Sequence, residues 1–404
     1  MISSTIQALL TDESQAFIQK HQNEIPEKLL FKKYPDSLPI KAIVHQLKSR
    51  QKIKEKLPSW YADSRFIFPS KVSIEQCSSE KTALYKSRLI TQGKKMVDLT
   101  GGMGIDFMDL SQCFEEAIYV EQEQELTTLA KHNFAIAACK GVTIVRADAT
   151  DYLKQLEPID FVFIDPHRRD DTNQKIVLLE SCLPNVVVLQ HEILQKAKSL
   201  LIKASPMLAI KQAIQSLHFV KEVHVVSVKN ECKELLFLME KSWTKAPQII
   251  ASNILSQKTV SFRFTYAEEE SYVTETSKAQ HYLYLPNNSI TKAGAFKSIA
   301  KRFLLRKLHK NSHIYTSTDL IADFPGRIFE LEEEIGYTKA KQRLKEKGIQ
   351  TATIIIRNFK DDIGNIRKKL KVKKEGKNIL FATTNVDERQ VILLCKEYVC
   401  DQSD

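Results

Sequence analysis

The sequence predicts an α/β protein whose core is a mostly parallel β-sheet covered by helices. Between residues 86 and 242, short apolar segments alternate with amphipathic stretches, which is typical of such a sheet. Residues 1–85 have apolar side chains at roughly helical spacing, interrupted by prolines, and predict a helical N-terminal domain. Residues 243–404 mix strands with basic helices in another order and predict an α+β C-terminal region.

Composition narrows the class of protein. A chain of 404 residues with 43% hydrophobic residues is long enough for two or three packed domains. No apolar run approaches the roughly eighteen residues of a membrane span, and the N-terminus MISSTIQALLTDESQ lacks the pattern of a secretion signal. Seven cysteines without a C-x-x-C pair argue against a disulfide framework and a zinc site. We therefore expect a cytoplasmic protein without a metal.

The strands of the core follow from its apolar segments. The parallel strand candidates are KMVDL (95–99), AIYVE (117–121), VTIVR (142–146), FVFID (161–165) and SLLIK (199–203). Two more, VHVVSV (223–228) and ELLFLM (234–239), are joined only by KNECK. Because a parallel crossover needs about a dozen residues, the last strand should run antiparallel.

A glycine-rich loop follows the first strand in MVDLTGGMGIDF. Loops at the carboxyl edge of a parallel sheet bind ligands, and glycine lets a ligand approach the backbone, although a tight turn would also explain the glycines. The dinucleotide pattern G-x-G-x-x-G lacks its third glycine here. Asp98 would repel a pyrophosphate but would tolerate a sulfonium and an amino-acid tail. The candidate cofactor-binding residues are Asp98, Thr100, Gly101, Gly102 and Gly104.

Acidic residues also end the next two strands. Glu121 follows the second strand, where a carboxylate can accept both hydroxyls of a ribose; the alternative is a solvated charge. Asp148 and Ala149 follow the third strand, where an acid commonly accepts an adenine amino group. Asp148 is also a candidate helix N-cap, and the two roles are compatible.

The stretch FVFIDPHRRDD places a candidate catalytic group after the fourth strand. We expect Asp165 and Pro166 to position the acceptor of the reaction, and Arg168 and Arg169 to clamp a phosphate or a base edge. The alternative is that the two arginines pair with neighbouring acids. His167 is a second, less favoured candidate base.

The net charge of +11 favours a polyanionic partner. An amphipathic helix is predicted within residues 281–317, with an apolar stripe formed by Ile290, Ala293, Phe296, Ile299, Phe303 and Leu304. Its candidate RNA-binding residues are Lys297, Lys301, Arg302, Arg306 and Lys307. The alternative is an ordinary solvated helix face.

These motifs resemble those of a known family. The acid, glycine loop, later acids and final antiparallel strand resemble the S-adenosylmethionine site of class I methyltransferases, although Thr100 stands where a glycine is common. The whole chain resembles bacterial class I methyltransferases with a ferredoxin-like segment and a THUMP-like domain. The resemblance lies in EQCSSEKTALYK, DLTGGMGID, DPHRR, IKASPM, KNECKELL, AGAFKSIAKRF, DFPGR and TTNVDERQ.

The resemblance implies a domain plan and an activity. The core at 86–242 would be a Rossmann-like methyltransferase domain, followed by a ferredoxin-like segment at 243–325 and a THUMP-like RNA-binding domain at 326–404. The expected reaction is S-adenosylmethionine-dependent methylation of a base in structured RNA, either tRNA or rRNA. The alternatives are a methyltransferase acting on a protein or small molecule, and a non-catalytic RNA-binding protein that kept the fold.

Overall fold

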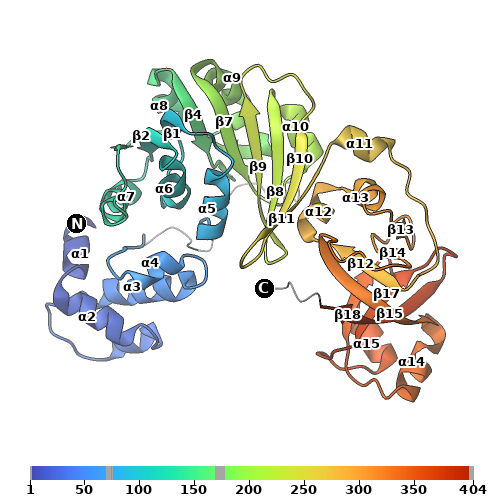
Figure 1. Cartoon of the computed structure of the whole chain (residues 1–404). Coiled ribbons are helices and arrows are strands. Elements are labelled where there is room, and N and C mark those ends of the chain that lie inside the picture. The colour runs from blue at the N-terminus through green and yellow to red at the C-terminus, as the bar shows by residue number, and fades with distance from the viewer. Residues whose placement is uncertain (1, 70–73, 75, 169–177, 400–404) are drawn as a thin grey trace. The chain divides into compact units, whose positions relative to one another are not determined.

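A computed structural model describes residues 2–69, 74, 76–168 and 178–399 (Figure 1). The chain divides into two compact units, which are described separately. Unit 1 comprises Met1–Lys221 and Leu235–Lys245, and unit 2 comprises Glu222–Glu234 and Ala246–Asp404. Across the described residues, no helix combines the length and apolar composition that crossing a membrane requires.

The N-terminal part of unit 1 is helical, as predicted. Its helices are α1 (Ile2–Leu9), α2 (Asp12–His21), the 3-10 helix η1 (Pro26–Phe31), α3 (Ile40–Ile53), α4 (Pro58–Ala62) and α5 (Glu80–Ser87). Pro26 and Pro58 begin helices, where the missing N–H of proline costs no hydrogen bond. Ile18, Ile43 and Leu47 form part of the apolar core that joins these helices.

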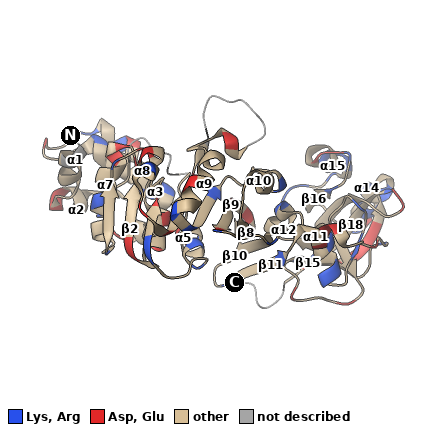
Figure 2. Ribbon diagram, turned by 90° about the horizontal axis from the view of Figure 1, so that it is seen from above, with Lys and Arg blue, Asp and Glu red and all other residues tan. Residues whose placement is uncertain are grey.

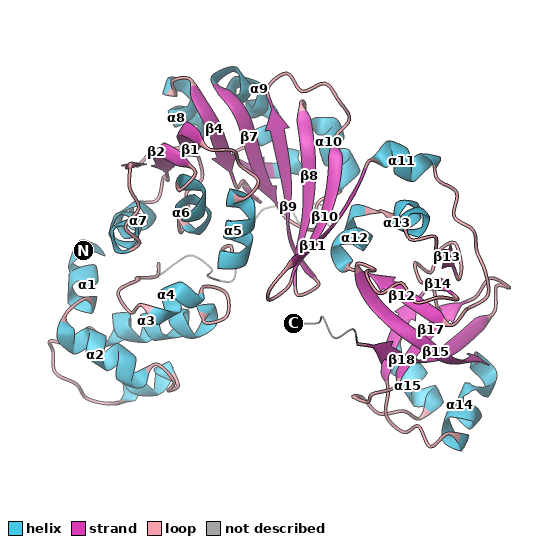
Figure 3. Cartoon of the chain, viewed as in Figure 1, coloured by secondary structure: helices cyan, strands magenta, loops and turns pink. Residues whose placement is uncertain are grey.

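The core of unit 1 is a sheet in the strand order β9-β7-β4-β1-β2-β3. Its strands are β1 (Gly93–Asp98), β2 (Phe114–Val120), β3 (Val142–Val145), β4 (Ile159–Ile164), β7 (Ala197–Ala204) and β9 (Glu231–Glu240). Neighbouring strands from β7 to β3 pair in parallel, and β9 pairs antiparallel with β7. This confirms the predicted α/β class and the antiparallel final strand (Figure 3).

Helices and short segments connect these strands. The helices are α6 (Ile105–Ser111), α7 (Gln124–Ile136), α8 (Ala149–Gln155), α9 (Val186–Lys196) and α10 (Ile210–Ser216), with the 3-10 helix η2 (Leu179–Ser181). Two short strands, β5 (His167–Arg168) and β6 (Cys182–Leu183), pair antiparallel beside the main sheet. The parallel strands are nearly all apolar because helices cover them, which matches the sequence pattern.

Unit 2 contains two groups of strands. In the first, β8 (Val220–Val228) pairs in parallel with β10 (Gln248–Ile254), which pairs antiparallel with β11 (Thr259–Phe264). The second is a sheet in the order β13-β14-β12-β15-β18-β17-β16, antiparallel except for β16 and β17. Its strands are β12 (Tyr282–Pro286), β13 (Arg306–Lys307), β14 (Tyr315–Ser317), β15 (Gly326–Gly336), β16 (Thr353–Arg357), β17 (Ile379–Thr384) and β18 (Gln390–Tyr398).

The helices of unit 2 correct one prediction. They are α11 (Tyr266–Ser271), α12 (Asn288–Ala293), α13 (Phe296–Arg302), α14 (Tyr337–Glu346) and α15 (Ile363–Leu370). The predicted amphipathic helix is broken into α12 and α13 by Gly294, which ends α12 with a φ of 82°. Leu304 lies beyond α13 and is 85% exposed, so it is not part of the buried stripe. Lys307 is buried in β13, where its ammonium bonds the Lys310 carbonyl.

Two side-chain amides join the N-terminal helices to the core of unit 1. Asn133 on α7 accepts a hydrogen bond from the N–H of Ile67 at 3.1 Å and donates to its carbonyl at 2.9 Å. Gln46 on α3 does the same for Phe68, at 2.9 and 3.0 Å. Because all four residues are buried, these bonds replace the backbone partners that a strand would supply.

Replacing Asn133 tests this connection. The Asn133→Leu variant should lose about 2–3 kcal/mol of unfolding free energy, because the N–H and carbonyl of Ile67 would be buried without a partner. Urea denaturation followed by circular dichroism measures the change. Lys131→Leu, on the exposed face of the same helix, serves as the control. Equal stability of the two variants would contradict the assigned role of Asn133.

Candidate functional site

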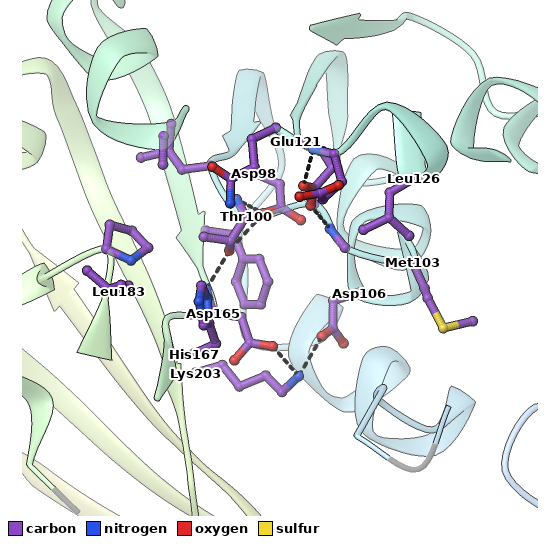
Figure 4. Close-up of a pocket in the computed structure, with 18 of the residues that line it drawn as sticks. Asp98, Thr100, Met103, Asp106, Glu121, Leu126, Asp165, His167, Leu183 and Lys203 are labelled. Carbon is purple, nitrogen blue, oxygen red and sulfur yellow. Dashed lines mark hydrogen bonds and ion pairs between the residues drawn. The ribbon is translucent and has the colours of Figure 1, made fainter. Parts of the chain in front are cut away.

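A cavity of about 800 Å³ lies at the carboxyl edge of the sheet in unit 1 (Figure 4). Its volume falls in the range of small-molecule sites. Asp98, Glu121, Asp148 and Asp165, which follow or end β1, β2, β3 and β4, all line it. The structure therefore brings together the acidic residues that the sequence singled out on separate strands.

One side of the glycine loop packs against two aromatic side chains of the same unit. A Cβ on Gly101 would come within 2.2 Å of the Tyr119 ring, and one on Gly104 within 2.5 Å of the Phe134 ring. A Cβ on Gly102 would meet only the Thr100 carbonyl oxygen, at an ordinary contact distance of 3.8 Å, but Gly102 has a φ of 55°, a conformation that favours glycine. Two of the three glycines are thus required by aromatic side chains beneath the loop, a reason that the sequence did not indicate. All three line the cavity.

Thr100 connects two strand ends. Its N–H donates to Asp98 Oδ1 at 2.9 Å, and its hydroxyl donates to the same oxygen at 3.4 Å. The same hydroxyl accepts a hydrogen bond of 2.7 Å from the N–H of Asp165. The departure from the family pattern at this position therefore has a structural explanation, since a glycine would leave the ends of β1 and β4 without this link.

Glu121 and Asp148 hold the loops around them. Glu121 accepts hydrogen bonds of 2.9 Å from the N–H groups of Gly102 and Glu123, one on each carboxylate oxygen. Asp148 caps α8, since its Oδ1 accepts from the N–H groups that begin that helix, so the N-cap prediction is confirmed. Ala149, the first residue of α8, lines the cavity beside it.

The carboxylates crowd one another. Burial raises the pKa of Asp98 well above its usual value of 3.8, and the nearby charges of Asp106, Asp165 and Glu121 raise it further. Lys203 is the only lysine or arginine among the described residues that line the cavity. The site is therefore acidic and suits a ligand with positive charge better than a pyrophosphate.

A buried ion-pair network forms the floor of the site, and the sequence analysis assigned it no role. Lys203 Nζ lies 2.6 Å from Asp165 Oδ2 and 3.3 Å from Asp106 Oδ2. Asp106 also pairs with Lys86 at 3.1 Å and accepts a hydrogen bond of 2.7 Å from the Ser78 hydroxyl. The sequence could have indicated this network through Lys203, because a lysine at the end of the otherwise apolar strand SLLIK needs a partner for its charge.

The polar cluster before α5 has two functions. Ser79 and Thr82 form a capping box at the start of α5. Ser78 instead faces the cavity and bonds Asp106. This segment therefore both caps α5 and contributes to the lining of the cavity.

The DPHRR stretch is described in part. Pro166 is buried and His167 is exposed at the edge of the cavity. The backbone of Arg168 pairs with Cys182 in the β5–β6 pair, and Arg169 lies outside the described residues. The expected clamp by the two arginines stays a prediction.

The candidate RNA-binding residues of unit 2 differ in their accessibility. Lys301 and Arg302 are exposed, and Lys297 is partly exposed. Arg306 is exposed and pairs with a nearby glutamate at 3.1 Å. Lys307 is buried, and burial lowers its pKa, so it is not a surface contact for RNA. Basic residues also gather at the ends of α14 and α15 (Figure 2).

The described residues contain neither a metal-binding cluster nor a disulfide. In the part of the chain that the structure describes, no group of three His, Cys, Asp or Glu side chains is placed to hold a metal ion. The six cysteines within that part are free thiols.

Comparison with solved structures places the chain in a family. A crystal structure of a "putative methyltransferase" from Porphyromonas gingivalis W83 superposes with a TM-score of 0.87. It shares 35% sequence identity, over 95% of this chain and 97% of that one. The chain belongs to the same family. Its residues 282–325 match a model of a ferredoxin-like domain, and residues 326–397 match a THUMP domain-like model.

Other solved structures are much more distant. A putative methyltransferase from Streptococcus mutans in complex with SAH has 14% identity and a TM-score of 0.30, over 40% of this chain and 94% of that one. TrmK of M. capricolum, in complex with S-adenosyl-homocysteine, has 14% identity and a TM-score of 0.30, over 39% of this chain and 67% of that one. Likeness this low does not bear on the chemistry of this chain. No curated protein matches it in sequence.

Asp98 and Asp106 should respond oppositely to neutralisation. Asp98→Asn should stabilise the free protein at pH 7 by roughly 1–3 kcal/mol, because it removes a buried charge while its amide oxygen still accepts from Thr100. The native pKa of Asp98 lies above its unfolded value, so the gain shrinks as pH falls through the raised pKa. It disappears below pH 3.8, where both states are protonated.

Asp106→Asn should instead destabilise the protein by about 3–5 kcal/mol, because Lys86 and Lys203 would lose their shared partner. Burial raises the pKa of Asp106, but the two ammonium groups outweigh it and lower that pKa to about 2. Its contribution is therefore present above pH 3.8 and lost as pH falls through 2. Urea unfolding across pH measures both variants, and shifts of the same sign at pH 7 would contradict the assigned charges.

Proposed function

We propose that the chain is an S-adenosylmethionine-dependent methyltransferase (EC 2.1.1.-) that acts on structured RNA, either tRNA or rRNA. The observation that supports this most strongly is the acidic cavity, in which carboxylates from four adjacent parallel strands surround a glycine loop. A dinucleotide would bring its pyrophosphate against these charges, whereas a cationic sulfonium nucleoside complements them.

The residues present fit this cofactor. Each carboxylate oxygen of Glu121 accepts one hydrogen bond from a backbone N–H, and a carboxylate oxygen can accept a second hydrogen bond from a ribose hydroxyl. Asp98 would favour a positive charge, and Asp148 and Ala149, which line the same cavity, would meet the adenine end. When bound, S-adenosylmethionine supplies an electrophilic methyl group on a good leaving group. The protein then has mainly to position the acceptor.

The acceptor end of the proposed site is at Asp165. It follows β4, its N–H is held by Thr100, and its side chain is partly exposed to the cavity. The sequence favours a base as the acceptor, because Asp165 and Pro166 match the start of the motif that base-amino methyltransferases carry. RNA offers two kinds of acceptor, the nitrogens of its bases and the hydroxyls of its riboses.

RNA as the substrate is supported by charge and by domain content. The chain has a net charge of +11, and the match to a THUMP domain-like model covers residues 326–397. Exposed cations at Lys301 and Arg302, and at the ends of α14 and α15, suit the phosphates of RNA. Such a substrate agrees with a cytoplasmic enzyme.

The assay that tests this function transfers tritiated methyl groups from S-adenosylmethionine to cell fractions of a strain that lacks the gene. Label should appear in RNA and not in protein or small molecules. Label in the protein or metabolite fraction would favour the rival methyltransferase function. Absence of transfer, together with absence of cofactor binding in calorimetry, would favour a non-catalytic RNA-binding protein.

Glu121 provides a direct test of the cofactor site. Glu121→Gln should weaken binding of S-adenosylhomocysteine by roughly 10- to 100-fold, because an amide accepts hydroxyl hydrogen bonds less well than a carboxylate. Isothermal titration calorimetry measures the affinity. Glu115→Gln, on the exposed start of β2, is the matched control. Equal affinities for the two variants would remove Glu121 from the site.

A further inference from the structure

Lys203 and Asp165 meet at the acceptor end of the cavity. Lys203 lies on β7, Asp165 follows β4, and Nζ lies 2.6 Å from Oδ2 (Figure 4). The side chain of Asp165 is 38% exposed and that of Lys203 is 12% exposed. Both line the cavity, so a carboxylate and an ammonium group face the same acceptor position.

A buried ion-pair network lies behind this pair. Asp106 lies 3.3 Å from Lys203 and 3.1 Å from Lys86, whose side chain is fully buried. Two ammonium groups and two carboxylates thus alternate along Lys86, Asp106, Lys203 and Asp165, with no net charge. The low pKa of Asp106, about 2, means that its charge balances the lysines at neutral pH. Lys203 therefore has two carboxylate partners, of which Asp165 is the more accessible.

We propose that the methyl acceptor is a hydroxyl group, and that on RNA it is the 2′-hydroxyl of a ribose. This inference rests on the proposed function and names the acceptor atom, and it replaces the base acceptor that the sequence motif alone favours. Within an RNA strand, free hydroxyls belong to the riboses, whereas the bases offer amino groups and ring nitrogens. The carboxylate–ammonium pair suits the first kind of acceptor and not the second.

Hydroxyl and nitrogen acceptors differ in the sign of the charge that develops on them during methyl transfer. A hydroxyl becomes a good nucleophile as its proton leaves, and the oxygen gains negative charge, which the Lys203 ammonium stabilises. Asp165 accepts that proton as the oxygen–carbon bond forms, while the bond from the methyl group to its donor breaks and leaves its electron pair on the donor. An amino or ring nitrogen instead gains positive charge, which a fixed ammonium nearby opposes.

The same two strands contain a matched control pair. Lys198 on β7 and Asp160 on β4 also form an ion pair, with Nζ 2.6 Å from Oδ1. Their side chains are 80% and 23% exposed, and neither residue lines the cavity. A change at Lys198 therefore removes an equivalent ion pair between the same strands without touching the site.

The test uses the full-length protein and RNA from a strain that lacks the gene, labelled with tritiated methyl groups and then hydrolysed in alkali. A 2′-O-methyl group blocks cleavage of the neighbouring phosphodiester, so the label should appear in alkali-stable dinucleotides. Label in mononucleotides would mean a methylated base and would overturn this inference alone. Failure to label any RNA would overturn the proposed function and this inference with it.

Substitution separates the role of Lys203 from a purely structural one. Lys203→Met should reduce transfer to RNA at least about 100-fold, because it removes the group that stabilises the developing oxyanion. Its affinity for S-adenosylhomocysteine, measured by calorimetry, should stay within about threefold of the unchanged protein, and Lys203→Arg should recover part of the transfer. Lys198→Met should retain both activity and affinity. Full transfer by Lys203→Met would overturn the inference.

Discussion

The crowding of carboxylates at one edge of a parallel sheet is the constraint on which the rest of unit 1 depends. Parallel strands end on the same side, so Asp98, Glu121, Asp148 and Asp165 necessarily converge. Convergence costs free energy because like charges repel and Asp98 is fully buried. Hydrogen bonds from backbone N–H groups and ion pairs with two lysines behind the acceptor end stabilise these carboxylates. A ligand of positive charge would relieve the remaining repulsion.

Much of this arrangement could be predicted from the sequence. Apolar strands alternating with helices indicate a parallel sheet. The short link KNECK between the last two strands leaves no room for a crossover, so the antiparallel strand could be predicted. The acidic residues at strand ends can be recognised in the sequence because each follows an apolar run. The sheet topology then determines that they meet, so no long-range contact had to be guessed.

The features that the sequence did not reveal depend on contacts between distant residues. Nothing in the local pattern shows that the Tyr119 and Phe134 rings lie beneath the glycine loop, or that Lys86 reaches Asp106. The amphipathic helix predicted within residues 281–317 was wrong in its continuity, because amphipathic spacing persists across Gly294 although the backbone turns there. Lys307 looked like a surface charge for the same reason, since periodicity does not tell a short strand from a last helical turn.

The amide contacts of Asn133 have a consequence for the glycine loop. Its neighbour Phe134 packs under Gly104, so two consecutive residues of α7 support the N-terminal helices and the cavity wall respectively. Loosening one attachment shifts the backbone to which the other belongs. The N-terminal helices therefore support the glycine loop through α7. Removing the chain before Ile67 would alter the conformation of the loop, although none of the removed residues lines the cavity.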